Sequence, residues 1–135
     1  MTGIVIAGHG NFASGVMSAI ELVAGIPEQF ACVDFEKGQD VAELKEGLLS
    51  AIRSMEGEQV LLLVDILGGS PFNTAAQLLL EDTGKQLKVI AGMNMAAVVQ
   101  AVFMREMISF EDLPAQVLAA GKEGMVDVSA MMNGV

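Results

Sequence analysis

The only histidine of the chain, His9, lies between two glycines directly after a short apolar run at residues 4–7. A free imidazole is largely neutral at cellular pH, so it is a competent nucleophile. The flanking residues Gly8 and Gly10 allow a sharp turn and the close approach of a partner molecule. A loop histidine without a function fits the same position, and the surroundings of His9 alone do not separate the two interpretations.

Asp65 directly follows the most apolar run of the chain, residues 60–64. If both runs are parallel strands, the Asp65 carboxylate and the His9 ring lie at the same edge of the sheet. A carboxylate that accepts a hydrogen bond from one imidazole nitrogen fixes the tautomer and leaves the other nitrogen able to attack. Taken alone, Asp65 is more typical of an aspartate in a turn or a helix cap.

The sequence Gly68-Gly69-Ser70-Pro71 predicts a glycine turn into a helix, with Ser70 as the N-cap and Pro71 as the first helical residue. The amides and the dipole at a helix N-terminus suit a phosphate, and the Ser70 hydroxyl can donate to a phosphoryl oxygen. An ordinary helix start explains these residues as well. The loop lacks the lysine of a Walker P-loop, which excludes a P-loop NTPase, and it also lacks the Gly-x-Ser-x-Gly elbow of hydrolases.

A second helix N-terminus, at residues 11–14, is expected to direct its amides toward His9. A phosphoryl group on His9 would then be stabilised by both loops, without a metal ion or a cofactor. The candidate phosphate-binding residues are Gly10, Asn11, Gly68 and Gly69. The candidate catalytic residues are His9, Asp65 and Ser70. This set predicts phosphoryl transfer, because that reaction requires mostly positioning and charge stabilisation.

The apolar pattern indicates which elements position these residues. Short apolar runs with β-branched residues alternate with segments of helical spacing, which is typical of an α/β fold with a parallel sheet wrapped by helices. We expect strands at 4–7, 30–33, 60–64, 87–91 and 125–128. We expect helices, caps included, within 13–24, 40–52, 70–84, 94–106 and 112–121. In such sheets ligands bind beyond the carboxyl ends of the strands, which is where the candidate residues fall.

The composition limits the class of partner. The chain has 135 residues, so we expect one domain, residues 1–135, that buries its own core. Seven basic against seventeen acidic residues give a net charge of −10, which argues against nucleic acid and an anionic membrane surface. No apolar run approaches the roughly 20 residues of a membrane span, and no basic segment indicates a signal peptide. One histidine and one cysteine argue against a metal cluster or a disulfide, so we expect a cytoplasmic protein.

A competing interpretation uses the same first loop. Gly8, Gly10 and Ala13 match the Gly-x-Gly-x-x-Gly/Ala pattern of a dinucleotide site, and Asp34 lies about 20 residues further on, where a ribose acid is expected. The chain is short for a complete dehydrogenase, and this interpretation gives no role to the aspartate and serine of the later loop. A stand-alone dinucleotide-binding regulatory module therefore stays open as the alternative function.

Three segments of the chain carry a family resemblance: IVIAGHG at 4–10 with FASG at 12–15, VDILGGSPFN at 64–73, and GMN at 92–94. Together they resemble the enzyme IIA component of the mannose-type family of the sugar phosphotransferase system, over roughly residues 3–130. The resemblance implies that His9 is phosphorylated on Nε2 by the histidine-containing phosphocarrier protein and passes the phosphoryl group to enzyme IIB. It also implies that Asp65 hydrogen-bonds the histidine and that Ser70 with its loop contacts the phosphate.

The resemblance has further implications for architecture. It implies a doubly wound sheet of four parallel strands, and a homodimer in which a C-terminal strand, here residues 125–128, is exchanged. Many members continue with Leu-Pro after the third segment, where this chain has Met95-Ala96, so we expect local differences in the next helix. No linker or second domain follows, so we expect enzyme IIB to be a separate chain. The membrane components select the sugar in this family, so the sequence leaves the sugar open.

Overall fold

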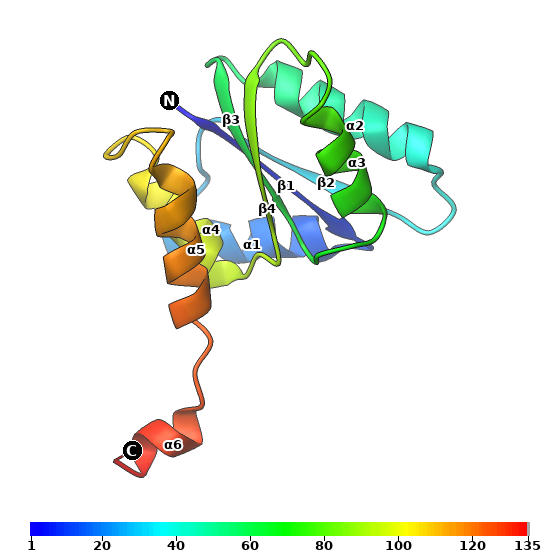
Figure 1. The fold of residues 1–135 in the computed structure, drawn as a ribbon. Coiled ribbons are helices and arrows are strands. Elements are labelled where there is room, and N and C mark those ends of the chain that lie inside the picture. The colour runs from blue at the N-terminus through cyan, green and yellow to red at the C-terminus, as the bar shows by residue number, and fades with distance from the viewer. Residues whose placement is uncertain (135) are drawn as a thin grey trace.

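Four parallel strands form the centre of the structure, a computed structural model that describes residues 1–134. The elements, in chain order, are β1 (Gly3–His9), α1 (Phe12–Ala24), β2 (Phe30–Phe35), α2 (Val41–Ser54), β3 (Gln59–Val64), α3 (Ser70–Leu78), β4 (Gln86–Ala91), α4 (Met95–Met104), α5 (Leu113–Glu123) and α6 (Val128–Met132). Figure 1 shows the strands between helices that pack on both sides. The predicted α/β class with a doubly wound parallel sheet is confirmed.

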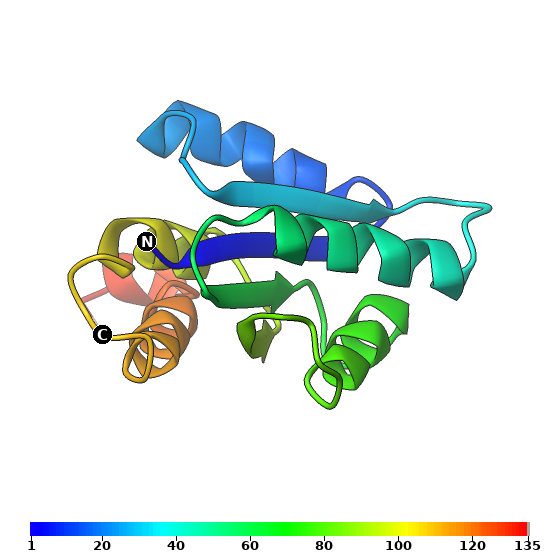
Figure 2. The ribbon, with the colours of Figure 1, turned by 90° about the horizontal axis from the view of Figure 1, so that it is seen from above.

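The strand order is β2-β1-β3-β4, and Figure 2 shows the strands side by side in this order. The chain leaves β1 for the neighbouring strand on one side, β2, and then crosses over to β3 on the other side. The order therefore reverses between β1 and β3, which is where ligands bind in open α/β sheets. The pairing of Ala7 with Val64 places the carboxyl ends of these two strands side by side.

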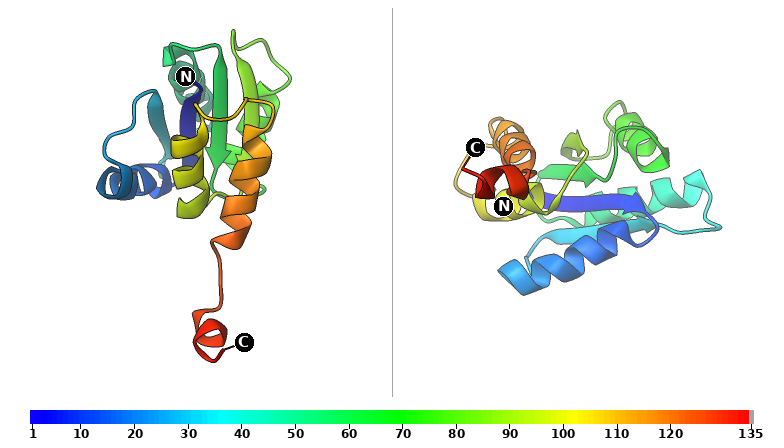
Figure 3. Two further views of the ribbon diagram at one scale, coloured as in Figure 1. Left: turned by 90° about the vertical axis from the view of Figure 1, so that its left-hand side faces the viewer. Right: turned by 90° about the horizontal axis from the view of Figure 1, so that it is seen from below.

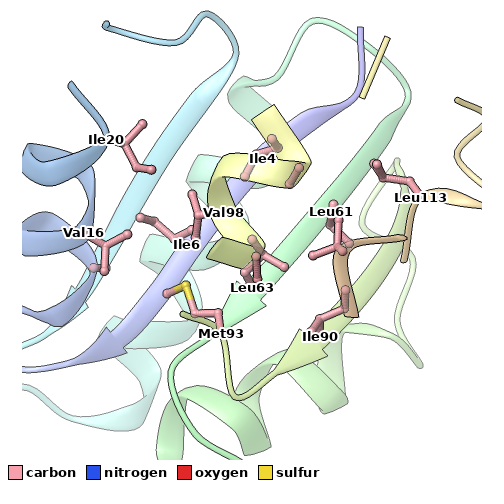
Figure 4. Close-up of a cluster of buried hydrophobic side chains, with 14 of the residues drawn as sticks. Ile4, Ile6, Val16, Ile20, Leu61, Leu63, Ile90, Met93, Val98 and Leu113 are labelled. Atoms are coloured by element: carbon pink, nitrogen blue, oxygen red, sulfur yellow. The ribbon is translucent and has the colours of Figure 1, made fainter. Parts of the chain in front are cut away.

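The two central strands are buried on both faces, which explains their continuous apolar sequence. Because side chains alternate along a strand, Ile4 and Ile6 enter one core cluster while Val5 and Ala7 enter the other. Helices α1, α4 and α5 cover the first cluster, and α2 and α3 cover the second. Figure 4 shows part of the first cluster, where side chains of β1, β3 and β4 meet those of the covering helices.

The N-caps predicted at Asp40 and Asn94 are confirmed, whereas the helix predicted within 70–84 differs at both ends and stops at Leu78. The Asp40 carboxylate accepts from the amide of Glu43 (2.8 Å) and caps α2, and the Asn94 side chain accepts from the amide of Ala97 (3.0 Å) and caps α4. The prediction of Ser70 as an N-cap is wrong, because the cap of α3 is Gly69, with φ +86°, and Ser70 is the first helical residue. The glycine adopts the left-handed conformation that this turn requires.

The C-terminal strand predicted at 125–128 does not form within the single chain. Residues 125–127 belong to no helix or strand, and Val128 begins α6, whose N-cap Asp127 accepts from the amide of Ala130 (3.1 Å). Figure 3 shows this segment extending away from the body, so no strand edge of the same chain lies beside it. A strand needs such an edge for its hydrogen bonds. Exchange of this segment in a dimer stays a prediction.

A buried arginine fixes the amino edge of the sheet. Arg105 follows α4, is only 6% exposed, and donates hydrogen bonds to three backbone carbonyls: those of Thr2 (3.2 Å), Glu28 (2.5 Å) and Gln29 (3.0 Å). These bonds join α4 to the start of β1 and to the loop before β2. Across residues 1–134, no helix combines the length and the apolar character that a bilayer span requires.

Candidate active site

The predicted pair, His9 and Asp65, meets at the carboxyl edge of the sheet where the strand order reverses. His9 is the last residue of β1, and Asp65 directly follows β3. The Asp65 amide donates to the carbonyl of Ala7 (3.1 Å), which continues the ladder between the two strands by one residue. The sheet register itself therefore places the carboxylate beside the imidazole.

The Asp65 carboxylate holds the His9 ring by a short hydrogen bond. His9 Nδ1 lies 2.8 Å from Asp65 Oδ2, and the same oxygen accepts from the backbone amide of His9 (2.9 Å). Asp65 Oδ1 accepts from the amide of Ile66 (2.9 Å). An ionised carboxylate only accepts hydrogen bonds, so it favours the tautomer with the hydrogen on Nδ1. Nε2 then carries a lone pair and is the nucleophilic atom of the ring.

The surroundings of Asp65 favour its ionised form. Burial of the carboxyl raises its pKa, but the hydrogen bonds from the His9 amide and ring, together with the Ile66 amide, outweigh burial and lower the pKa of Asp65 below its ordinary value. The carboxylate is 10% exposed, whereas the His9 side chain is 48% exposed. The pair therefore combines a fixed, ionised orienting group with an accessible nucleophile.

Two glycines permit the close packing around the pair. A Cβ on Gly69 would lie 2.9 Å from His9 Cε1 and 3.1 Å from His9 Nε2, so the backbone of the second loop lies against the Nε2 edge of the ring. A Cβ on Gly8 would lie 3.0 Å from the Phe12 ring and 3.1 Å from Asp65 Cβ. At Gly8 the neighbours would have to shift by a few tenths of an ångström, and at Gly69 the His9 ring itself would have to move, so the absence of a Cβ on Gly69 brings the start of α3 next to the nucleophilic nitrogen.

The start of α3 offers hydrogen-bond donors beside Nε2. The amides of Ser70 and Phe72 belong to the first turn, where amides lack an acceptor within the helix, and Pro71 has no N–H. The Ser70 hydroxyl makes no hydrogen bond to any atom of residues 1–134. Gly68 and Gly69 both adopt positive φ, +88° and +86°, and form the turn that delivers these donors.

The first loop offers fewer donors than the sequence suggested. The amide of Gly10 donates to the carbonyl of Phe35 (2.9 Å), so it is already occupied. Asn11 is the N-cap of α1 without a side-chain cap bond. The Ser14 amide donates to Asp34 Oδ1 (3.0 Å), so the carboxylate assigned to a ribose in the dinucleotide interpretation caps a helix instead. The amides of Phe12 and Ala13 lie in the first turn of α1 and lack an acceptor within the helix, so they remain as donors together with Asn11.

Phe35 is a residue of the site that the sequence analysis did not include. This residue ends β2, pairs with His9 in the sheet register, and lies beside the imidazole with ring centroids 6.3 Å apart and an interplanar angle of 68°. The predicted strand ended at residue 33, two residues too early, so the aromatic side chain was not placed at the site. The signal was present, because Phe35 continues the alternation of the strand beyond Asp34.

An exposed apolar rim, formed by three residues that lie next to the site residues along the chain, accompanies the site. Phe12, Ile66 and Leu67 are 40%, 56% and 75% exposed and come from the two loops that form the pair. Phe72, the other aromatic residue close to the loops, is partly buried and packs against the core cluster under α2 and α3. Large apolar side chains exposed together commonly mark a protein interaction surface.

Comparison with known proteins shows the family to which the chain is similar. The chain matches the family model described as "PTS system fructose IIA component" over residues 3–118. It is 32% identical over 114 residues to the "PTS system fructose-specific EIIA component" of Bacillus subtilis, covering 84% of this chain and 77% of that protein. It is 32% identical over 129 residues to the "PTS system mannose-specific EIIAB component" of Escherichia coli, covering 94% of this chain but only 39% of that protein.

A solved structure has the same architecture over nearly the whole chain. The phosphotransferase system component EIIA from Streptococcus agalactiae superimposes with a TM-score of 0.90 at 35% sequence identity. The match covers 96% of this chain and 99% of that chain.

Proposed function

Because the chain belongs to the mannose-type enzyme IIA family of the sugar phosphotransferase system, we propose that it carries a phosphoryl group on Nε2 of His9. The donor is the histidine-containing phosphocarrier protein, and the acceptor is enzyme IIB. The observation that carries this proposal is the 2.8 Å bond between His9 Nδ1 and Asp65 Oδ2, with Nε2 turned toward Gly69. That geometry gives one ring nitrogen a proton and the other a lone pair.

The transfer step follows from this arrangement. The lone pair of His9 Nε2 attacks the phosphorus of the donor's phosphohistidine, and the phosphorus–nitrogen bond of the donor breaks as the new bond forms. The electron pair of the broken bond stays on the donor imidazole. Positive charge grows on the His9 ring, and the Asp65 carboxylate stabilises it through Nδ1. Attack by a nucleophile of enzyme IIB on the same phosphorus releases His9 in its original state.

The phosphoryl oxygens need donors that do not move during the reaction. We place the Ser70 hydroxyl, the amide of Ser70 and the turn of Gly68 and Gly69 on these oxygens, with Asn11 contributing from the first loop. Gly10 supports the site as a turn residue, because its amide is already bonded. In this proposal no cofactor takes part.

Protein partners must reach His9 directly. The exposed rim of Phe12, Ile66 and Leu67 is suited to cover the transfer site in both complexes and to exclude water from it. The proposal places the protein in the cytoplasm, with the membrane reached only through the permease complex. We also propose a homodimer, as the family resemblance implies.

Phosphate incorporation tests the proposal. Wild-type protein and the His9→Ala variant are incubated with phosphoenolpyruvate, enzyme I and the phosphocarrier protein, and the intact masses are compared. We expect one acid-labile phosphoryl group on the wild type and none on the variant. Incorporation into His9→Ala would refute the assignment of His9. No incorporation into wild type, with both upstream proteins active, would refute the carrier function and favour the dinucleotide interpretation.

A further inference from the structure

We propose that Phe35 is a positioning residue for phosphoryl transfer, which fixes the plane of the His9 imidazole so that Nε2 points at the first turn of α3. The proposal rests on the proposed carrier function and adds a residue to its site. The Phe35 ring lies 6.3 Å from the His9 ring between centroids, and the two planes are inclined by 68°. This edge-on arrangement is a favoured geometry for two aromatic rings.

The hydrogen bond to Asp65 alone does not determine the ring plane. It restrains one atom, Nδ1, and leaves the ring able to tilt about that atom. The His9 side chain is 48% exposed, so about half of its surface has no protein neighbour. Gly69 limits movement at the Cε1 and Nε2 edge. A further contact is needed to hold the plane, and Phe35 provides one from the neighbouring strand.

Phe35 is itself held firmly enough for this role. It pairs with His9 in the register of β1 and β2, and its carbonyl accepts from the amide of Gly10 (2.9 Å). Its side chain packs against the core cluster covered by α2 and α3. The backbone of Phe35 is therefore bonded to the turn after His9 and its ring packs on the core, so the imidazole rests against a fixed surface.

A nucleophile held in its attack geometry reacts faster, because less orientational freedom is lost in the transition state. Aromatic contacts of this kind change equilibria by about two- to tenfold. We therefore expect loss of the Phe35 ring to lower the rate of the chemical step by about two- to tenfold. Binding of the phosphocarrier protein should change little, because Phe35 is only partly exposed.

The Phe35→Leu variant tests the proposal against the matched control Phe30→Leu. Phe30 lies in the same strand, is also half-buried, pairs with Ile4 instead of His9, and packs on the other core cluster. Two donors are used: the phosphocarrier protein, and phosphoramidate, a small donor that needs no docking surface and releases ammonia on transfer. Because His9 is the only histidine, the order parameter of its Cε1–H bond is measured in each variant by NMR without overlap.

We expect Phe35→Leu to lower kcat with the phosphocarrier by about two- to tenfold at nearly constant KM, to slow the phosphoramidate reaction equally, and to lower the ring order parameter. Phe30→Leu should leave all three unchanged while it lowers stability. Unchanged ring order, a raised KM at constant kcat, or equal effects in the control would overturn the proposal. If wild type accepts phosphate from neither donor, the proposed carrier function is refuted. The ring order parameters alone then show whether Phe35 fixes the plane of the His9 ring.

Discussion

Replacement of Asp65 by asparagine removes the charge that orients His9 but keeps the shape of the side chain. In the wild type, Oδ2 accepts from both the amide and the ring of His9, and Oδ1 accepts from Ile66. Asparagine has one acceptor oxygen, so its NH2 group must face a donor on one of the two sides. If it faces His9, Nδ1 becomes an acceptor and the ring hydrogen moves to Nε2, which blocks the nucleophile.

The expected magnitude follows from the bond that is lost. A hydrogen bond to a charged group contributes about 1.5–3 kcal/mol, and this bond strengthens as charge grows on the ring. We expect phosphoryl transfer to slow by about 10- to 100-fold. The free energy of unfolding should fall by no more than about 2 kcal/mol, so the variant stays folded. Transfer is measured in rapid-quench experiments, and the tautomer by 15N chemical shifts of His9.

The stability difference between wild type and Asp65→Asn should also depend on pH in a defined direction. The pKa of Asp65 is lower in the folded protein than its ordinary value. The contribution of its charge to the free energy of unfolding is therefore fully present above about pH 4 and is lost as the pH falls through the lowered pKa. Urea titrations of both proteins between pH 7 and pH 2 should therefore converge at low pH. Transfer at the wild-type rate, with the ring hydrogen still on Nδ1, would refute the orienting role of the carboxylate.

Three further substitutions test separate parts of the structure. Gly69→Ala should reduce phosphate incorporation more than 10-fold, because its Cβ would lie 3.1 Å from His9 Nε2 and its φ of +86° disfavours alanine; an active, folded variant would contradict this. Asp34→Ala should lower the free energy of unfolding by about 1 kcal/mol, because the Ser14 amide loses its acceptor at the start of α1. Phosphoryl transfer should persist. Urea unfolding checks the first expectation, and a transfer assay checks the second. Arg105→Met should lower the free energy of unfolding, measured in urea, by at least about 2 kcal/mol, because the side chain loses its hydrogen bonds to three backbone carbonyls.

Much of the fold could be predicted because the central strands have a simple signature. The runs at 4–7 and 60–64 are apolar at every position, and burial on both faces is the reason. The pairing of His9 with Asp65 followed from the parallel arrangement, since both residues come directly after these strands. The end of β2 was harder to predict, because Asp34 interrupts its apolar run and only the alternation of the strand points to the half-buried Phe35.

The features that the sequence did not reveal depend on local geometry or on a neighbouring segment. Ser70 has the residue type of a cap, but the left-handed turn at Gly69 moved the cap back by one position. Gly10 was named as a candidate phosphate-binding residue, and its residue type does not show that its amide donates to the carbonyl of Phe35. The strand at 125–128 needs an edge that the same chain does not place beside it (Figure 3). None of these contacts can be read from residue types and spacing.

The position of the phosphoryl group on the His9 ring is the most direct test of the proposed carrier function. Protein labelled with 15N is phosphorylated through the phosphocarrier protein and examined by 31P and 15N NMR, where the single histidine gives one unambiguous set of signals. We expect phosphorus bonded to Nε2, with the hydrogen retained on Nδ1 and hydrogen-bonded to Asp65. A phosphoryl group on Nδ1, or on Ser70 instead of the histidine, would contradict the mechanism.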